Sequence, residues 1–287
     1  MSANRKIAVF ILTNGRPDNV ITYKTLRAVG YTGKIYLIVD DEDNRLQEYK
    51  DKYKDEVIVF SKKDYAHKFD IMDNFTGSKV IVYARNACND IARKLGLDYF
   101  FEYEDDYSRF TYRKYVDGSL KTIRIKDFDS VLNVVIDALN NTKSCSIAFT
   151  QAGEMQGGVL AIGHVHLKRK AMNSFVFKVN KDKSDDLIFI GRMNDDINTY
   201  LTQGKVGKLF FQVANVMLDQ GLTQQVAGGN TEAYLKSGTY VKSFYSVMAE
   251  PSCVKIGSHG RTNARVHSSV KWKMAVPKIL DEKHKKL

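Results

Sequence analysis

Cysteine and proline are both scarce in this chain of 287 residues, which holds only 3 of each. The cysteines Cys88, Cys145 and Cys253 are odd in number and far apart, which argues against a disulfide framework and fits a reducing cytoplasm. No Cys or His spacing is typical of a structural zinc site. Because no proline-rich or Gly/Ser-rich stretch marks a linker, we expect one continuous domain over residues 1–250. We expect residues 251–287 to form a basic extension that packs on the same domain.

Long apolar runs are missing as well. Runs such as Val57–Phe60 and Leu187–Ile190 have the length of a strand, whereas a membrane-spanning helix needs about 18–20 apolar residues. The first apolar segment, Ile7–Leu12, is short and is followed by Asn14-Gly15-Arg16-Pro17, which is not typical of a signal peptide. The sequence therefore predicts no membrane partner, and we expect a cytoplasmic protein.

Negative charge is also in short supply, because the net charge is +11 and the pI about 9.3. Residues 251–287 alone contain nine Lys or Arg against two Asp or Glu. A localised basic surface favours a polyanionic partner such as nucleic acid, and an aromatic ring beside it can stack on bases. A solvated tail that only aids solubility is the alternative. The residues predicted to contact nucleic acid are Arg261, Arg265, Lys271, Trp272 and Lys273.

Apolar strands alternate with helical segments in the first hundred residues. The predicted strands are Lys6–Leu12, Lys34–Asp40, Glu56–Phe60 and Tyr99–Tyr103, and the predicted helices are Asp18–Val29, Glu42–Tyr53 and Val82–Leu95. This alternation is typical of an α/β protein with a mainly parallel, doubly wound, Rossmann-like sheet. The second half is less regular, with helices predicted over Asp127–Asn140 and Ile197–Gln203 and strands over Ser146–Phe149 and Leu209–Met217.

Two acidic clusters follow predicted strands, where ligands of parallel sheets bind. They are Asp40-Asp41-Glu42-Asp43 and Glu104-Asp105-Asp106. On an extended segment Glu104 and Asp106 face the same way, so both can reach one Mn²⁺ or Mg²⁺ ion. Such an ion binds and neutralises a nucleotide diphosphate when positions remain open for phosphate oxygens. Asp105 faces elsewhere and is available to the sugar or ribose of a donor.

The helix before this strand begins with Ala84-Arg85-Asn86. The order of Ala-Arg-Asn helix, apolar strand and acidic cluster resembles the GT-A glycosyltransferases. That resemblance implies a GT-A fold, a divalent metal and a nucleotide-sugar donor, with UDP-sugars first. Arg85 is predicted to contact a donor phosphate beside the free N–H groups of the helix start, and a surface ion pair is the alternative for it.

The resemblance to GT-A enzymes extends to other turns. Thr13-Asn14-Gly15-Arg16 occupies the place that binds uracil or ribose, and Asp40-Asp41 the place that holds the nucleoside. The segment Gly191–Asp196 is similar to the Gly-Glu-Asp segment that supplies the catalytic base of inverting members, although Asn194 intervenes and Asp replaces Glu. The base is therefore Asp195 or Asp196, and both an inverting and a retaining mechanism stay open.

A third metal ligand in such enzymes is commonly a histidine from a C-terminal segment. His259 and His267 are the candidates, and His267 is the predicted ligand because it lies within a second, wider resemblance. Segments such as 238–245, Arg265-Val266-His267 and Val270-Lys271-Trp272 resemble the phage TET-associated glycosyltransferases.

That family implies transfer of a sugar to a hydroxymethylated pyrimidine, first of all 5-hydroxymethylcytosine, in phage DNA within the host bacterial cytoplasm. A GT-A enzyme acting on a glycan or protein is the alternative. A metal-dependent nuclease that uses the same carboxylates is disfavoured by the Ala-Arg-Asn helix.

Overall fold

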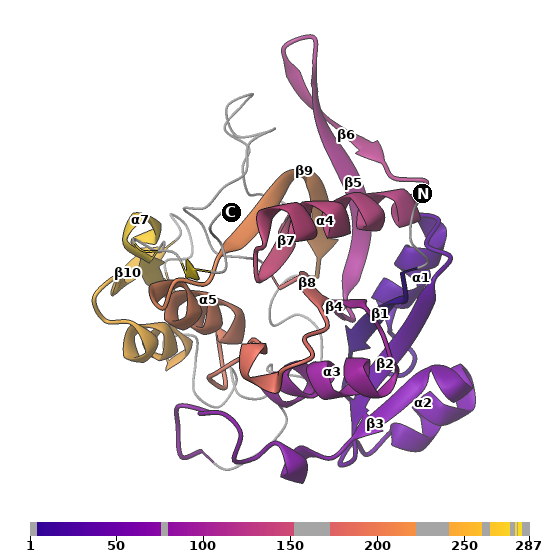
Figure 1. Ribbon diagram of the computed structural model, residues 1–287, viewed down its shortest axis with the longest axis horizontal. Helices are drawn as coiled ribbons and strands as arrows, with labels where there is room; N and C mark the ends of the chain where they lie inside the picture. The colour runs from indigo at the N-terminus through magenta and orange to yellow at the C-terminus, as the bar shows by residue number, and fades with distance from the viewer. Residues whose placement is uncertain are drawn as a thin grey trace.

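The computed structural model describes residues 5–75, 80–151, 173–221, 241–259, 265–275, 279 and 281–282. Most of the strands join one large sheet (Figure 1). They are β1 (Ile7–Leu12), β2 (Lys34–Asp40), β3 (Val57–Phe60), β4 (Tyr99–Glu104), β5 (Tyr107–Val116), β6 (Ser119–Arg124), β7 (Ser146–Gln151), β8 (Phe175–Lys178) and β9 (Phe210–Gln220). A separate two-stranded sheet pairs β10 (Val254–His259) with β11 (Arg265–Val270). The helices are α1 (Ile21–Ala28), α2 (Leu46–Tyr53), α3 (Val82–Lys94), α4 (Phe128–Thr142), α5 (Asp195–Lys205) and α7 (Trp272–Ala275).

The large sheet has the order β3-β2-β1-β4-β8-β7-β9-β5-β6. Its first four strands are parallel, and β7 and β9 also pair in parallel, whereas β8 and β5 run antiparallel to their neighbours. Seven of the nine described strands therefore point the same way. The α/β class with a mainly parallel sheet, predicted from the sequence, is confirmed.

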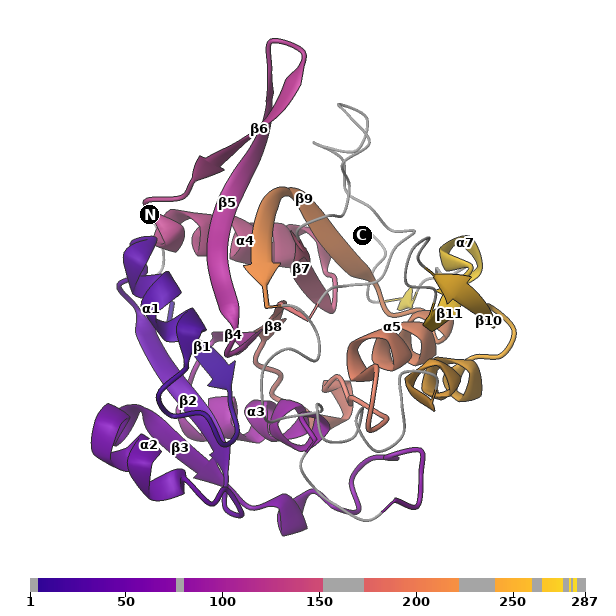
Figure 2. The ribbon, with the colours of Figure 1, turned by 180° about the vertical axis from the view of Figure 1, so that it is seen from behind.

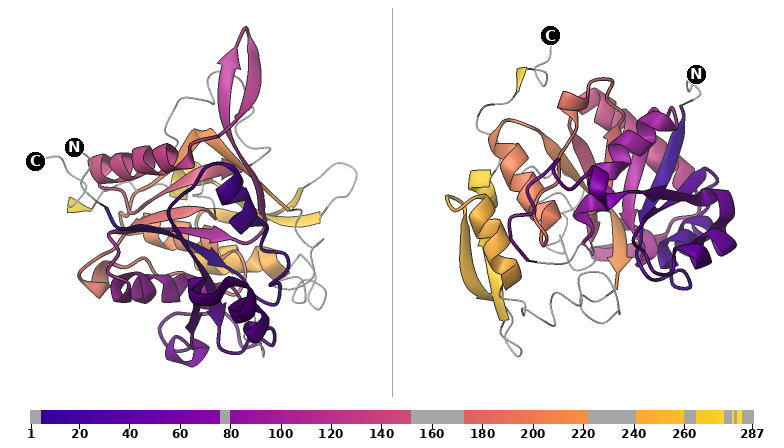
Figure 3. Two further views of the ribbon diagram at one scale, coloured as in Figure 1. Left: turned by 90° about the vertical axis from the view of Figure 1, so that its right-hand side faces the viewer. Right: turned by 90° about the horizontal axis from the view of Figure 1, so that it is seen from below.

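Both faces of the sheet are covered, as a doubly wound arrangement requires. Along β1, Ala8, Phe10 and Leu12 join the apolar cluster that contains α3 and α5, while Val9 and Ile11 join the cluster that contains α1 and α4. The left view of Figure 3 shows α4 and α3 on opposite sides of the sheet. Alternate side chains of one strand thus enter two cores, which explains why the strand is apolar throughout.

The C-terminal extension packs on the main body over its described part. The ring of Trp272 lies 5.5 Å from that of Tyr200 in α5, and Ala275 of α7 is buried in the same core as Tyr200. The boundary at residue 250 stays a prediction. No helix within the described ranges is both long and apolar enough to cross a bilayer.

Several elements have no counterpart in the predicted pattern. They are the short strand β8, the small sheet of β10 and β11, helix α7, and the hairpin formed by β5 and β6, which rises from the body of the molecule (Figure 2). The hairpin starts directly after the acidic cluster at residues 104–106, in a stretch for which no element was predicted.

Candidate active site

Three turns meet at the carboxyl edge of the parallel strands. Leu12 of β1 lies beside Ile38 of β2 on one side and Glu104 of β4 on the other. The polar residues that follow these strands are therefore neighbours in space, as the ends of parallel strands must be. The structure brings together Thr13–Arg16, Asp40–Asp43 and Glu104–Asp106 as the sequence predicts.

Asp105 joins the first turn to the third. Its carboxylate accepts a hydrogen bond from Thr13 Oγ1 at 2.6 Å and forms an ion pair with Arg16 Nη2 at 2.8 Å. Tyr49 of α2 lies on the other side of this contact, with its hydroxyl 2.8 Å from Thr13 Oγ1 and 2.8 Å from the backbone N–H of Arg16. Both oxygens of Asp105 thus have protein partners, so the carboxylate orients the turn after β1.

The turn after β2 is fixed in a similar way. Asp40 is buried. It accepts a hydrogen bond from Asn14 Nδ2 at 2.6 Å and forms an ion pair with Lys62 Nζ at 2.9 Å. Gly15 has a φ of 70°, in the left-handed region, and its N–H donates to Asp43 at 2.6 Å. Asp41 is exposed at the rim. These contacts leave Asn14, Gly15 and Asp41 as the partly exposed groups of the predicted nucleoside site.

Arg85 of α3 connects β4 to the start of α5. Its guanidinium donates from Nη1 to Glu102 at 2.7 Å, from Nη2 to Glu104 at 2.7 Å and from Nε to Asp195 at 2.5 Å. The rings of Phe175 and Phe189 lie 5.4 and 5.3 Å from the guanidinium carbon. All three carboxylates are oriented by one cation that lies beside two aromatic rings.

Arg85 faces the protein interior in this structure. The side chain is 1% exposed, and each of its three nitrogens donates to a carboxylate. Its contact with a donor phosphate stays a prediction. Burial opposes its charge, but the three carboxylates raise the pKa of Arg85 well above its ordinary value. Arg85 thus orients Glu102, Glu104 and Asp195.

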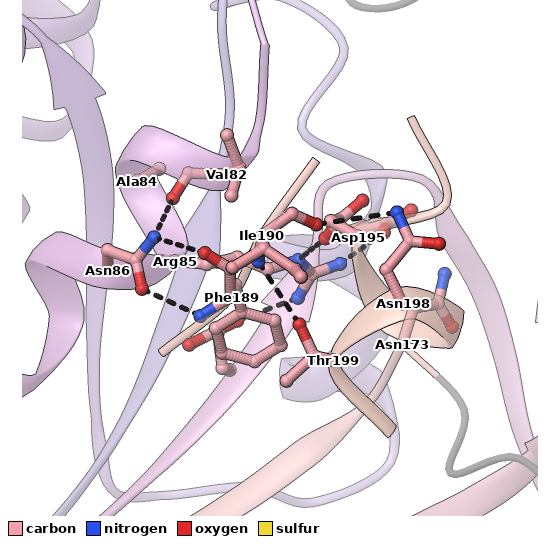
Figure 4. A network of polar contacts seen from close by, with 12 residues as sticks. Val82, Ala84, Arg85, Asn86, Asn173, Phe189, Ile190, Asp195, Asn198 and Thr199 are labelled. Carbon is pink, nitrogen blue, oxygen red and sulfur yellow. Dashed lines mark hydrogen bonds and ion pairs between the residues drawn. The ribbon is translucent and has the colours of Figure 1, made fainter. Parts of the chain in front are cut away.

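Asn86, the next residue of the same motif, binds a backbone segment (Figure 4). Its Nδ2 donates to the carbonyl of Phe189 at 3.0 Å, and its Oδ1 accepts from the N–H of Phe189 at 2.9 Å. Further along, Asn198 of α5 donates to the carbonyl of Met193 at 2.9 Å. The Ala-Arg-Asn motif therefore anchors the loop 189–194 that leads into α5, as well as the side chain of Asp195.

Among the described residues near this edge, six carboxyl groups stand against two guanidinium groups. The carboxyl groups belong to Glu102, Glu104, Asp105, Asp106, Asp195 and Asp196, and the guanidinium groups to Arg16 and Arg85. Burial, followed by the charges of Glu104 and Asp105, raises the pKa of Asp106 to about 7. Burial also raises the pKa of Glu102 to about 7. An added cation would be stabilised here.

The two candidate bases differ in their surroundings. Asp195 is 6% exposed and is held by Arg85, and burial raises its pKa to about 6. Asp196 is more exposed, and its charge raises the pKa of both Asp195 and Glu104, so it lies beside the acidic cluster. Asn194, which precedes them in a left-handed conformation, donates to the Lys242 carbonyl and to Ser246. The helix start is thus fixed, with Asp195 turned inward.

The predicted metal ligands are only partly brought together. Glu104 accepts from Arg85 and from Gln220 Nε2, the latter at 2.6 Å, and a carboxylate with two such bonds still has free lone pairs. Asp106 Oδ1 is buried and has no hydrogen-bond partner among the described residues. An unpartnered buried oxygen beside a second carboxylate fits a cation ligand.

His267 lies elsewhere. It belongs to β11, which Figure 2 shows on the far side of α5 from the end of β4. In the described part of the chain, no three His, Cys, Asp or Glu side chains are grouped so that they could hold a metal ion. The role of His267 as third ligand stays a prediction.

The residues predicted to bind nucleic acid have mixed surroundings. Trp272 is partly buried and packs edge-on against the ring of Tyr200 at the border of the core, with centroids 5.5 Å apart. Its role in base stacking stays a prediction. Lys271 and Lys273 are exposed beside it. Arg265 contributes backbone to β11, and Arg261 and the side chain of Arg265 lie outside the described residues.

Several site residues were not predicted from the sequence. Gln220 at the end of β9 bonds Glu104 and also accepts from Gln151 at 2.7 Å and Asn173 at 2.9 Å. Lys62 holds Asp40. No local motif marks these residues. Glu102 is different, because a carboxylate between aromatic residues in the interior of a buried strand is itself a signal that a buried cation faces it.

The mainly parallel sheet, with polar turns beyond its strand ends, defines an α/β protein of the predicted class. The model of the family described as TET-Associated Glycosyltransferase matches residues 7–229. The chain therefore belongs to the TET-associated glycosyltransferase family, and its activity is glycosyl transfer. No curated protein matches the sequence significantly.

Several solved structures are similar in outline. S. aureus TarS 1–349 in complex with UDP-GlcNAc has 10% identity and a TM-score of 0.46, with 85% of this chain and 67% of that chain covered. This chain spans 40% of the longer S. aureus TarS chain. Glucosyl-3-phosphoglycerate synthase from Mycobacterium tuberculosis, in complex with Mn²⁺, UDP and phosphoglyceric acid, has 8% identity and a TM-score of 0.47, with 94% and 91% covered. A mannosyltransferase from Pyrobaculum calidifontis with GDP-Man and Mn²⁺ has 9% identity and a TM-score of 0.44, with 86% and 74% covered.

Proposed function

We propose that this glycosyltransferase moves a sugar from a UDP-sugar to the hydroxymethyl group of 5-hydroxymethylcytosine in DNA, with Mn²⁺ or Mg²⁺ as cofactor. The observation that carries the proposal is the cluster of six carboxyl groups around Arg16 and Arg85, from β4, the turn after it and the start of α5, in a chain of this family. The DNA acceptor follows from what the family is expected to modify and from the net charge of +11.

The cofactor would be held by Glu104 and Asp106. Both are partly exposed, and Asp106 has the unpartnered oxygen. A divalent cation there would supply charge neutralisation for the diphosphate as it leaves. The turn after β1, with Asn14 and Gly15, and the rim residue Asp41 would bind the nucleoside, while Thr13, Arg16, Asp40 and Asp105 keep those turns in place through the hydrogen bonds between them.

The acceptor hydroxyl must lose a proton as its oxygen bonds to the anomeric carbon. In the same step the bond from that carbon to the diphosphate oxygen breaks, and the electron pair leaves with the nucleotide. We assign the base to Asp196, because Asp195 is buried and its carboxylate holds Arg85. This assignment makes the enzyme an inverting one.

Substitution of the two aspartates should separate these roles. Asp196→Asn should lower turnover by about 10²–10⁴-fold, the usual contribution of a general base, with unchanged donor affinity and melting temperature. Asp195→Asn should lower the melting temperature, because it weakens a buried ion pair, and should keep more turnover than Asp196→Asn. The measurements are initial rates, UDP-sugar titrations and thermal melts of both variants. A stable Asp195→Asn enzyme without turnover, beside an active Asp196→Asn enzyme, would reverse the assignment.

The proposed function is tested with a panel of UDP-sugars and other nucleotide sugars. The enzyme is incubated with each donor and with duplex DNA that contains cytosine, 5-methylcytosine or 5-hydroxymethylcytosine, and the DNA is digested to nucleosides for mass analysis. We expect a hexose or pentose mass to be added only to 5-hydroxymethylcytosine. Transfer to a glycan or protein, with no labelled nucleoside for any donor, would contradict the DNA acceptor.

A further inference from the structure

The hairpin of β5 and β6 extends the sheet away from the acidic cluster. Tyr107 follows Asp106 directly, and β5 pairs with β9 over Tyr107–Tyr112. Beyond Tyr112 the described part of β5 pairs with β6 alone, up to Val116. Figure 1 and the left view of Figure 3 both show the tip of this two-stranded ribbon standing clear of the body.

The turn at the tip is built for a tight ribbon. Val116 and Ser119 pair, so only Asp117 and Gly118 form the loop, and both have positive φ angles of 49° and 74°. Two consecutive left-handed residues with the sequence Asp-Gly are typical of a type I′ turn, whose twist matches that of the flanking strands. The ribbon is thus a defined element with a fixed register.

One face of the ribbon carries an unusual set of side chains. Lys114 and Lys121 lie directly opposite each other, and the neighbouring pair on the same face is Tyr112 and Ile123. All four side chains are exposed. Like charges directly opposite on a sheet are destabilising, and exposed aromatic and β-branched side chains gain nothing from water. Both costs fall when an anionic surface with an apolar component covers this face.

The charge of the whole ribbon has the same sign. Residues 107–126 contain six Lys or Arg and one Asp. Arg109 pairs with Asp219, and Arg113 is buried against Met217, which leaves Lys114, Lys121 and Lys126 as exposed lysines. Such a distribution attracts a polyanion along the length of the ribbon.

We propose that the β5–β6 ribbon binds the duplex that flanks the target base, with Lys114 and Lys121 on phosphates and Tyr112 against the groove. The proposal rests on the proposed DNA acceptor. A two-stranded ribbon fits the major groove of B-form DNA. The 10 residues of β5 span roughly 33 Å at about 3.3 Å each, close to the rise of ten base pairs at about 3.4 Å per step. The first residue of β5, Tyr107, directly follows the acidic cluster at residues 104–106.

A purely protective role for the lysines makes a different prediction. β6 is the edge strand of the large sheet, and lysines on an edge prevent strands of other molecules from pairing with it. That role explains charge, but it does not explain the exposed Tyr112 and Ile123 on the same face. Under it, removal of the lysines changes aggregation and leaves DNA affinity unchanged.

The test compares two double variants that lose the same charge. Lys114→Ala/Lys121→Ala removes the pair on the ribbon, and Lys50→Ala/Lys94→Ala removes two exposed lysines from α2 and α3. Affinity for a 24-base-pair duplex is measured by fluorescence anisotropy at several salt concentrations. The ribbon variant should bind more weakly. Its plot of log affinity against log salt should be shallower than that of the parent by about 1.8 in slope, since each of the two lost phosphate contacts contributes about 0.9. The control variant should keep the slope of the parent enzyme.

A third variant examines the apolar part of the contact. Tyr112→Ala should weaken binding without altering the salt slope, because an apolar contact releases no counterion. Equal affinity and slope in the ribbon and control double variants would overturn the proposal, as would an equal loss of affinity for single-stranded DNA of the same length. Thermal melts of all variants show that each is folded.

Transfer assays separate this proposal from the proposed acceptor. A five-nucleotide strand with 5-hydroxymethylcytosine is too short to reach the ribbon from the acidic cluster, so the ribbon variant should modify it at the parent rate and modify the long duplex more slowly. If the parent enzyme modifies no DNA, yet the ribbon variant alone loses duplex affinity, the binding surface stands and the proposed acceptor is wrong.

Discussion

Removal of divalent cations with EDTA should abolish sugar transfer, and added Mn²⁺ or Mg²⁺ should restore it in the parent enzyme but not in Asp106→Asn. Asp106 offers a buried oxygen without a partner among the described residues, next to Glu104. Amide substitution keeps the size of the side chain and removes its charge. Because charge stabilisation by a metal contributes several kcal/mol, we expect a loss of about 1,000-fold or more.

Two readouts make this metal prediction specific. Titration of Mn²⁺ into the enzyme with UDP should show binding to the parent and none to Asp106→Asn. Asp55→Asn, a change at an exposed acid in the short turn that follows α2, should bind Mn²⁺ and transfer sugar normally. Full transfer in EDTA, or an Asp106→Asn enzyme as active as Asp55→Asn, would show that no cation is held at this position.

The N-terminal half of the fold could be predicted because each element there is signalled locally. Apolar strands such as Lys34–Asp40 alternate with amphipathic helices, and the predicted bounds agree with the structure within a few residues. The ribbon of β5 and β6 also has a local signal, because Asp117-Gly118 separates two segments rich in β-branched and aromatic residues. β8 has none, since four residues of a strand inserted antiparallel between β4 and β7 are placed by long-range packing.

The sequence could predict only which site residues are neighbours because they lie at the ends of neighbouring strands. Thr13, Asp40 and Glu104 follow parallel neighbouring strands, so their proximity is a property of the topology. The topology does not determine the direction in which the Arg85 side chain points. That direction depends on Asp195, which lies 110 residues further along the chain. An arginine at a helix start faces solvent or phosphate unless the fold brings buried carboxylates to it.

Substitution of Arg85 by methionine should therefore destabilise the protein more than any change at the rim of the site. Glu102, Glu104 and Asp195 would lose their common partner, and Glu102 is fully buried. Removing one member of a buried ion pair costs about 3–5 kcal/mol, which corresponds to roughly 5–8 °C in melting temperature for a chain of this size. Transfer activity should be lost too, since Glu104 and the start of α5 are no longer fixed. Arg85→Lys should recover little, because an ammonium group cannot serve three carboxylates with the planar geometry of a guanidinium group.

A matched control and a second substitution distinguish the effect of the buried charge of Arg85 from the effect of losing any arginine. Arg109→Met removes an arginine whose side chain is 62% exposed in its pair with Asp219, and should cost at most about 1 kcal/mol. Glu102→Gln, combined with Arg85→Met, removes one of the uncompensated carboxylates without changing the shape of the side chain. The double variant should then be more stable than Arg85→Met alone, whereas Glu102→Gln in the parent should be destabilising or neutral. Thermal melts of the four proteins give this coupling directly. If Arg85→Met melts with the parent, or if Glu102→Gln adds to its loss, Arg85 does not hold the acidic cluster together by charge.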